Sequence, residues 1–164
     1  MAIIKTNQPK ITPCLWFDTN AEEAVKFYTS VFKKSKKLVV TRYTEGGPMP
    51  KGTVLTVLFQ IEGQEFLALN GGPHFKFTEA VSFIVNCKTQ KEIDYFWETL
   101  SKGGEKSQCG WLKDKFGLSW QVAPDNMDEM LSSKDEEKVN RVFQAVMKMK
   151  KIDLEKIKKA YSGK

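Results

Sequence analysis

The chain repeats one pattern of secondary structure twice, and this repeat limits the folds available to it. When the sequence is aligned with itself at an offset of 69 residues, Asn20 aligns with Thr89 and Glu23 aligns with Glu92. Asn20 with Glu23, and Thr89 with Glu92, have the three-residue spacing of a capping box, in which two side chains satisfy the free N–H groups at the start of a helix. A strand-like apolar run precedes each pair, and further apolar runs follow it. The sequence therefore predicts two modules of β-α-β-β-β order.

Apolar runs and turn residues place the elements of both modules. In the first module we expect strands over residues 11–17, 37–43, 53–61 and 65–70, with a helix from residue 21 to about Lys33. In the second module we expect strands over residues 80–86, 107–112 and 118–123. Its helix starts after Thr89 and ends at Gly103-Gly104, because glycine commonly terminates helices.

The last part of the chain, residues 126–164, is predicted to be helical. Ser133 and Glu136 have capping-box spacing, and Asp153 can cap a final helix. Residues 134–164 contain 10 basic and 5 acidic residues, so this tail holds +5 of the net charge of +6. A Lys-rich helical face is usually a solvated surface, and a nucleic-acid contact through the tail is the less favoured alternative.

Length and composition favour one domain that contains both modules. The 164 residues are 41% hydrophobic, which is enough for a core. We expect a single domain over residues 1–164, with module one at about 9–72, module two at about 78–125 and the tail at about 126–164. No apolar run reaches the length of a membrane helix, and the N-terminus lacks a secretory signal. The odd number of cysteines fits a reducing compartment, so we expect a cytoplasmic protein without a membrane partner.

Five stretches carry a resemblance to a known family: FDTNAEEAVKFYTSVF (17–32), ALNGGPHFKF (68–77), AVSFIVNC (80–87), EIDYFWETL (92–100) and QCGWLKDKFGLSWQVAPD (108–125). They resemble the PhnB-like branch of the vicinal-oxygen-chelate superfamily, which includes glyoxalase I, extradiol dioxygenases and bleomycin-resistance proteins. The branch is often labelled 3-demethylubiquinone-9 3-methyltransferase. The resemblance implies an α+β, glyoxalase-like fold in which the repeated modules form a curved, cup-like mixed sheet, followed here by C-terminal helices.

The glycine-rich segments do not support a methyltransferase activity. Enzymes that use S-adenosylmethionine commonly have a Gly-rich loop between a strand and a helix of a parallel sheet. Gly46-Gly47 and Gly71-Gly72 precede prolines and strands, and Gly103-Gly104 ends a helix. We therefore expect no cofactor, and whether the protein is an enzyme stays open.

The resemblance also locates the positions that hold a divalent ion in metal-using relatives. There, His, Gln or Glu side chains of the first and last strands of both modules hold an ion that polarises the substrate. These positions fall on Pro13 (or Thr12), on a residue within 67–70, on Ser82 and on Gln121. Proline has no donor atom, serine is a poor ligand, and residues 67–70 include no carboxylate or histidine. We therefore predict that the metal centre is absent.

Without a metal, the implied cup is a half-apolar concavity with a few amide and hydroxyl groups, which suits a small organic ligand. Alternation along the strands separates Phe17 from Trp16 and groups Ser82 with Asn86. We expect the sets that mix polar and apolar residues to face the cup, and Trp16 and Trp120 to face the helices. The predicted ligand-binding residues are Gln121, Ser82, Asn70, Asn86, Trp111, His74 and Phe17.

Each of these residues also has a structural interpretation. Gln121, Ser82 and Asn86 can satisfy backbone groups in a filled barrel, and neither interpretation is preferred. His74 titrates near neutrality, but a surface-loop histidine without a role is more common than a general base. Cys109 is better explained as an inert thiol than as a nucleophile.

The resulting hypothesis is a cytoplasmic glyoxalase-like protein that binds, or also transforms, a small organic molecule. A non-catalytic, sequestering binder is the main alternative. We also expect a homodimer, because the stripe Val142, Val146 and Met149 presents apolar positions that the modules leave uncovered.

Overall fold

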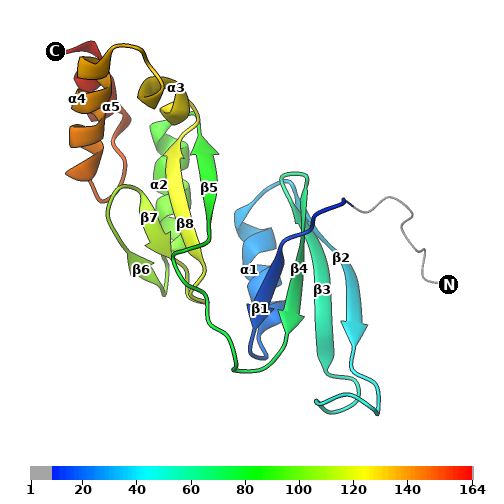
Figure 1. The fold of residues 1–164 in the computed structure, drawn as a ribbon. Helices are drawn as coiled ribbons and strands as arrows, with labels where there is room; N and C mark the ends of the chain where they lie inside the picture. The colour runs from blue at the N-terminus through cyan, green and yellow to red at the C-terminus, as the bar shows by residue number, and fades with distance from the viewer. Residues whose placement is uncertain (1–8, 164) are drawn as a thin grey trace. The chain divides into compact units, whose positions relative to one another are not determined.

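The computed structural model describes residues 9–163, and the chain divides into two compact units between Lys76 and Phe77. Each unit contains a four-stranded mixed sheet, and the second unit also carries the helical tail (Figure 1). The fold is α+β, and both sheets are open. The boundary falls between the two predicted modules. No helix within residues 9–163 is long and apolar enough to cross a bilayer.

The first unit has the predicted β-α-β-β-β order. Its sheet is arranged β1-β4-β3-β2, with β1 parallel to β4 and the other neighbours antiparallel. On one face the core includes Tyr28 of the helix, which stacks on Phe59 with ring centroids 6.2 Å apart. The elements are β1 (Cys14–Phe17), α1 (Ala21–Val31), β2 (Ser35–Arg42), β3 (Val54–Ile61) and β4 (Gln64–Asn70).

The second unit repeats this arrangement with the order β5-β8-β7-β6, in which β5 is parallel to β8. The helix buries Ile93, Trp97 and Leu100, and Thr89 forms the predicted capping box with Glu92. The elements are β5 (Ser82–Cys87), α2 (Gln90–Leu100), β6 (Glu105–Lys106), β7 (Trp111–Lys113) and β8 (Ser119–Pro124).

The strand predicted over residues 107–112 is instead mostly a turn, which joins β6, ending at Lys106, to β7, starting at Trp111. Cys109 and Gly110 both have positive φ values, 57° and 81°, so the chain cannot stay extended there. A side chain at Gly110 would place its Cβ 2.5 Å from the carbonyl oxygen of Val122. The glycine thus lets the turn approach β8 closely.

The repeat is in register at the helices but shifted by one residue at the first strands. The first residue of α2 lies 69 positions after the first residue of α1. In the first strands the offset is 70 positions, because the buried Leu15 and Phe17 of β1 correspond to the buried Val85 and Cys87 of β5. Three residues connect β1 to α1, and two connect β5 to α2. A shift of one residue exchanges the two faces of a strand.

The predicted facing of the first strand is therefore wrong. Leu15 and Phe17 are buried beside the buried Ala68 and Asn70 of β4, on the helix side of the sheet. Cys14 and Trp16 lie on the opposite face, which we call the open face because no helix of the same unit covers it. In the second unit the prediction is correct: Trp120 is buried on the helix side.

The helical tail packs on the second unit. Backbone N–H groups of Cys109 and Gly110 donate to the carbonyls of Met149 and Lys150, at 2.8 and 2.7 Å. The tail contains α3 (Met127–Leu131), α4 (Glu136–Met147) and α5 (Leu154–Ser162).

Two predictions about the tail need correction. Asp153 caps α5 as predicted, but α4 is capped by Asp135 and not by Ser133. Val142 and Met149 were expected to be uncovered, yet both are buried. The pairing of α4 with α5 and the hydrogen bonds of Met149 within the unit explain the burial of this stripe.

Candidate functional site

The open face of the second sheet gathers the polar residues that the sequence singled out. Trp120 and Val122 of β8 point to the helix side and are buried, so Ser119 and Gln121 point to the open face. Strand β5 adds Ser82 and Asn86 on the same face, with Ile84 between them. Ile84 is 57% exposed, which confirms that no part of the second unit covers this area.

Gln121 and Ser82 form a hydrogen-bonded pair at the centre of this face. The Nε2 group of Gln121 donates to Ser82 Oγ at 2.9 Å, and the pair is partly buried. No hydrogen bond to Gln121 Oε1 is found among residues 9–163, so this acceptor is left for another donor. Trp111 of β7 lies opposite Gln121 in the antiparallel ladder and is half-buried. The structure thus brings three of the predicted residues together, with the exposed Asn86 farther along β5.

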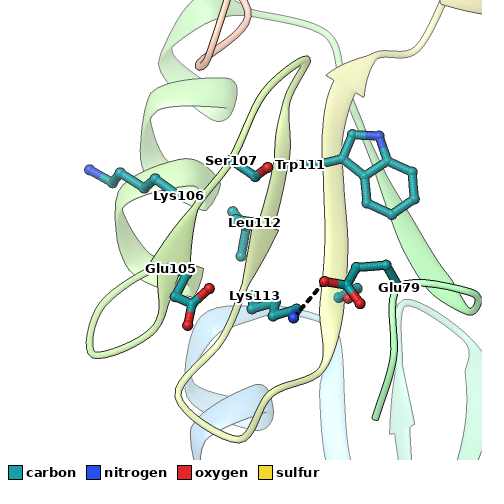
Figure 2. A pocket seen from close by; sticks show the side chains of 8 residues that line it. Glu79, Glu105, Lys106, Ser107, Trp111, Leu112 and Lys113 are labelled. Carbon is teal, nitrogen blue, oxygen red and sulfur yellow. Dashed lines mark ion pairs between the residues drawn. The ribbon is translucent and has the colours of Figure 1, made fainter.

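A pocket of about 400 Å³ opens beside these residues. Figure 2 shows Lys113 and Glu79 pointing toward each other across it, with the ion pair between them drawn as a dashed line. The Nζ atom of Lys113 lies 2.6 Å from Glu79 Oε1. Lys113 comes from β7 and Glu79 from the segment before β5. The pocket is lined by Glu79, Glu105, Lys106, Ser107, Trp111, Leu112, Lys113 and Ser119.

The two charges in this pocket stabilise each other. The hydrogen bond from Lys113, together with the N–H of Glu79 itself, lowers the pKa of the Glu79 carboxyl below its ordinary value. The same hydrogen bond raises the pKa of Lys113, and the charge of Glu105 adds to this effect. Both groups therefore stay ionised over the whole range from mildly acidic to mildly basic pH.

The open face of the first sheet has a different chemistry. Leu67 and Leu69 of β4 are half-buried there, next to Cys14 and Trp16 of β1. The indole N–H of Trp16 donates to the carbonyl of Gly72 at 2.8 Å, and the ring meets Phe75 edge-on at 4.9 Å between centroids. Trp16 was expected on the helix side. Its actual position anchors the segment that follows β4 against this face.

Asn70 occupies a structural position, because both ends of its amide bind backbone groups. Its Oδ1 accepts from the N–H of Ala21 at 2.9 Å, and its Nδ2 donates to the carbonyl of Val54 at 3.0 Å. The side chain is 3% exposed. It caps α1, a task that the sequence assigns to Asn20, whose side chain forms no capping bond. Asn70 and the buried Phe17 therefore lie away from the open faces.

The remaining candidates lie outside this cluster. His74 is exposed on the segment after β4, in the first unit, whereas Gln121 belongs to the second. Cys109 lies in the turn between β6 and β7, with its Sγ 3.7 Å from Met147 Sδ.

The residues at the implied metal positions do not fit a divalent cation. Because of the one-residue shift, Ser82 corresponds to Thr12 rather than Pro13, and Gln121 corresponds to Leu67. Leu67 has no donor atom, and Ser82 and Gln121 offer only a neutral hydroxyl and a neutral amide oxygen. Hard cations prefer carboxylates, and zinc prefers histidine or cysteine. No cluster of three or more such side chains is found among the described residues.

Among the residues that line the pocket, sequence reasoning predicted only Trp111 as a ligand contact. The residues it missed include Lys113, Glu79 and Ser119. Lys113 and Ser119 could have been found from the strand ladder, since they are paired across β7 and β8 on the face that carries Gln121. Glu79 lies outside regular structure. No local signal connects it to Lys113.

Comparisons with known proteins agree with this fold. The family model described as 3-demethylubiquinone-9 3-methyltransferase matches residues 9–123. A PhnB protein from Bacillus cereus is 39% identical, with a TM-score of 0.65 over 71% of this chain and 99% of that one. A search of the curated proteins gave no match.

More distant structures share the fold. Protein PA1353 from Pseudomonas aeruginosa is 18% identical, with a TM-score of 0.59 over 72% of this chain and 98% of that one. The fosfomycin resistance protein FosX from Listeria monocytogenes, described as a complex with Mn(II) and sulfate, is 13% identical with a TM-score of 0.53, over 76% of this chain and 96% of that one. The region that the family model matches ends within β8, so α3, α4 and α5 lie beyond it.

Proposed function

Since the chain belongs to the PhnB-like family described as 3-demethylubiquinone-9 3-methyltransferase, within the vicinal-oxygen-chelate superfamily, we propose that it binds a small organic molecule on the open face of its second sheet. The observation that carries this proposal is the Gln121–Ser82 pair beside Trp111 and a pocket of about 400 Å³. An amide with a free acceptor, a hydroxyl and an indole form the mixture of polar and apolar groups that is typical of ligand sites.

We propose that this site works without a divalent metal. Thr12, Leu67, Ser82 and Gln121 supply no carboxylate, histidine or cysteine, and Gln121 is held by Ser82. After incubation with Mn²⁺, Ni²⁺ or Zn²⁺ and extensive dialysis, elemental analysis should find far less than one ion per chain. One tightly held ion per chain, lost in Gln121→Ala, would contradict the metal-free site.

Binding without a reaction, as in a protein that sequesters its ligand, is the simplest form of this proposal, because it requires no catalytic groups. The open face of the second sheet carries neither histidine nor cysteine among the described residues, so the Ser82 and Ser119 hydroxyls have no imidazole base on this face to activate them as nucleophiles. The sheet also has only one parallel strand pair, and no Gly-rich turn joins its strands to a helix in the manner of cofactor-binding α/β folds. Both observations favour binding over a group-transfer reaction.

Benzamide is a suitable neutral probe, because it combines an aromatic ring for Trp111 with an amide for Gln121. Saturation-transfer NMR should detect its binding to the wild-type protein. Gln121→Ala should weaken binding by roughly 5–150-fold, the equivalent of one lost hydrogen bond of about 1–3 kcal/mol. The matched control is Gln60→Ala in β3 of the first sheet, whose amide binds the carbonyl of Gly63. Equal affinity of all three proteins would refute the proposed site.

The tail supports a structural role better than a nucleic-acid contact. Lys151 is 2.7 Å from Asp94 of α2, and Arg141 donates to the carbonyl of Ala160 at 2.9 Å. Cations that are already paired gain less from phosphate. We therefore propose no nucleic-acid partner, and we retain a cytoplasmic location, which suits three free cysteines.

The homodimer stays a prediction, now with different residues. Phe143 and Met147 of α4 are each 56% exposed and replace the buried Val142 and Met149 as apolar surface of the tail. Sedimentation at micromolar concentration should give about twice the 18.7 kDa of one chain. A monomer that persists at high concentration would contradict the dimer.

A further inference from the structure

The Lys113–Glu79 ion pair lies in the pocket next to the proposed site. Lys113 is held by the β7 strand, and its side chain is 31% exposed, whereas Glu79 is 62% exposed on a segment without regular structure. The lysine is therefore the positioned partner, and the glutamate is the one that can move away. An exposed ion pair of this kind contributes little to stability, so its replacement costs little.

A buried hydroxyl lies beside this ion pair without a partner. Ser119 pairs with Lys113 in the β7–β8 ladder and also lies opposite Ser82 of β5. The residue is 0% exposed, and its Oγ has no hydrogen-bond partner among residues 9–163. A buried hydroxyl without a partner is unfavourable. Ser119 is among the residues that line the pocket, and its buried O–H can reach a ligand there once a neighbouring side chain moves away.

The charges around the pocket favour a singly charged ligand. The lining contains two cations, Lys106 and Lys113, and two anions, Glu79 and Glu105. Both lysines form an ion pair of 2.6 Å, but the partner of Lys106 is Glu98 of helix α2, whereas the partner of Lys113 is Glu79, outside regular structure. Lys113 is also the less exposed of the two, so it is the better-placed cation for a ligand. A phosphate with two charges would face Glu105 and Glu79 with one cation to balance it. A carboxylate matches the group that Lys113 already binds.

We infer that this pocket binds the carboxylate group of an organic monoanion, which displaces Glu79 from Lys113 and accepts a hydrogen bond from Ser119. The inference rests on the proposed function and specifies the class of ligand. The apolar part of such a ligand lies toward Trp111, which is two residues before Lys113 on the same face of β7 (Figure 2). Gln121, opposite Trp111, then contacts the ligand beyond its carboxylate.

Benzoate tests this inference, with benzamide as its neutral counterpart. Glu79→Gln removes the competing carboxylate and should tighten benzoate binding about fivefold, while benzamide binding stays the same. Lys113→Gln should weaken benzoate binding roughly tenfold or more, and Lys113→Arg should restore most of it because the positive charge returns. The matched control is Lys51→Gln, which breaks the Lys51–Glu45 ion pair of the same length, 2.6 Å, in the first unit.

Ser119→Ala separates a ligand contact from a structural role. Since this hydroxyl has no partner among residues 9–163, its removal should leave the melting temperature unchanged or raise it slightly. Benzoate binding should weaken roughly tenfold or more in the same variant, the loss expected for one hydrogen bond to a charged group. A variant that melts early and binds benzoate like the wild type would show a structural hydroxyl.

Several outcomes would overturn the carboxylate site. These are benzoate binding that is unchanged in Lys113→Gln, benzoate binding that is weakened by Glu79→Gln, or no benzoate binding even in Glu79→Gln. Inorganic phosphate that binds more tightly than benzoate would also overturn it. The benzamide titration of Gln121→Ala keeps the two proposals apart: if benzamide binding depends on Gln121 while benzoate binding does not depend on Lys113, the proposed function stands and the carboxylate site fails.

Discussion

The open faces of the two sheets differ in chemistry. The open face of the first sheet carries Cys14, Trp16, Leu67 and Leu69. The open face of the second sheet carries Ser82, Gln121, Ser119 and Lys113. The strand orders are the same, β1-β4-β3-β2 and β5-β8-β7-β6. The buried residues on the helix side of both sheets are mainly apolar, with Asn70 as a polar exception in the first unit. The common topology is thus maintained by the helix side, and the other side of each sheet is free to differ in function.

The two helices also begin in different ways. Helix α2 is capped by its own neighbours, Thr89 and Glu92, within one turn of chain. Helix α1 receives a hydrogen bond from Asn70, which is 49 residues away in sequence from Ala21. A local cap stabilises only the helix, whereas the Asn70 side chain joins α1, β4 and β3. We expect the two caps to differ strongly in their contribution to stability.

The largest difference that we predict between the units concerns their cysteines. Burial, with the nearby charges of Glu92 and Asp125, raises the pKa of Cys87 from 9.0 to about 12, whereas Cys14 is exposed. The thiolate is the reactive form, so at pH 8 iodoacetamide should modify Cys87 about 1000-fold more slowly in the folded protein than in urea. Peptide mass spectrometry measures both sites. Modification of Cys87 as fast as that of Cys14 would contradict the burial.

The same pKa shift predicts how stability depends on pH. Above pH 9 the Cys87 thiol of the unfolded chain loses its proton, while the folded chain keeps it until the pH approaches about 12. The unfolded state then binds fewer protons, so the free energy of unfolding should fall as the pH rises through this range. Urea unfolding at pH 8 and pH 10 tests this, and Cys87→Ala should show a smaller decrease than the wild type.

Replacement of the tertiary cap should have the next largest effect. Asn70→Ala leaves the N–H of Ala21 and the carbonyl of Val54 buried without their partner. We expect a loss of about 3 kcal/mol in the free energy of unfolding, because each unpaired buried group costs roughly 1–3 kcal/mol. Asn86→Ala is the control, since this strand asparagine is exposed. Equal stability of the two variants would show that Asn70 does not hold α1.

Removal of the local cap should cost less. Thr89→Ala eliminates the acceptor for the N–H of Glu92, 3.2 Å away, and should lower stability by about 1 kcal/mol. Asn20→Ala, at the same position of the first helix, should change stability by less than ~0.5 kcal/mol because Asn20 makes no capping bond. Chemical denaturation of both variants measures the difference. If Asn20→Ala were the more damaging, the assignment of the two caps would be reversed.

A small effect on stability should also come from exchanging the open-face residues. Gln121→Leu gives the second sheet the residue that the first sheet has at Leu67. Because Gln121 is only partly buried and faces away from the core, the free energy of unfolding should change by less than ~1 kcal/mol. Early melting of this variant would identify Gln121 as a structural amide.

Much of the fold could be predicted, because its signals are local or periodic. The capping box at Thr89, the strand run of β5 and the apolar stripe of α2 each depend on residues within about one element, and all three are found in the structure. The turn between β6 and β7 was missed because Cys109 has a positive φ value, which a strand-like sequence does not reveal. The candidate site could be predicted only where strand alternation and the family resemblance agreed, as for Ser82, Trp111 and Gln121.

By itself, the sequence determined the two β-α-β-β-β modules and their family, since periodicity and turn residues act over short distances along the chain. Tertiary structure decided which face each side chain occupies. A connection that is one residue longer before α1 than before α2 exchanged the faces of the first strand and placed Phe17 in the core and Trp16 outside it. The tertiary structure also made Asn70 the cap of α1 and brought Glu79 next to Lys113. Such pairings depend on how strands align across a sheet, and no local pattern of residues specifies that alignment.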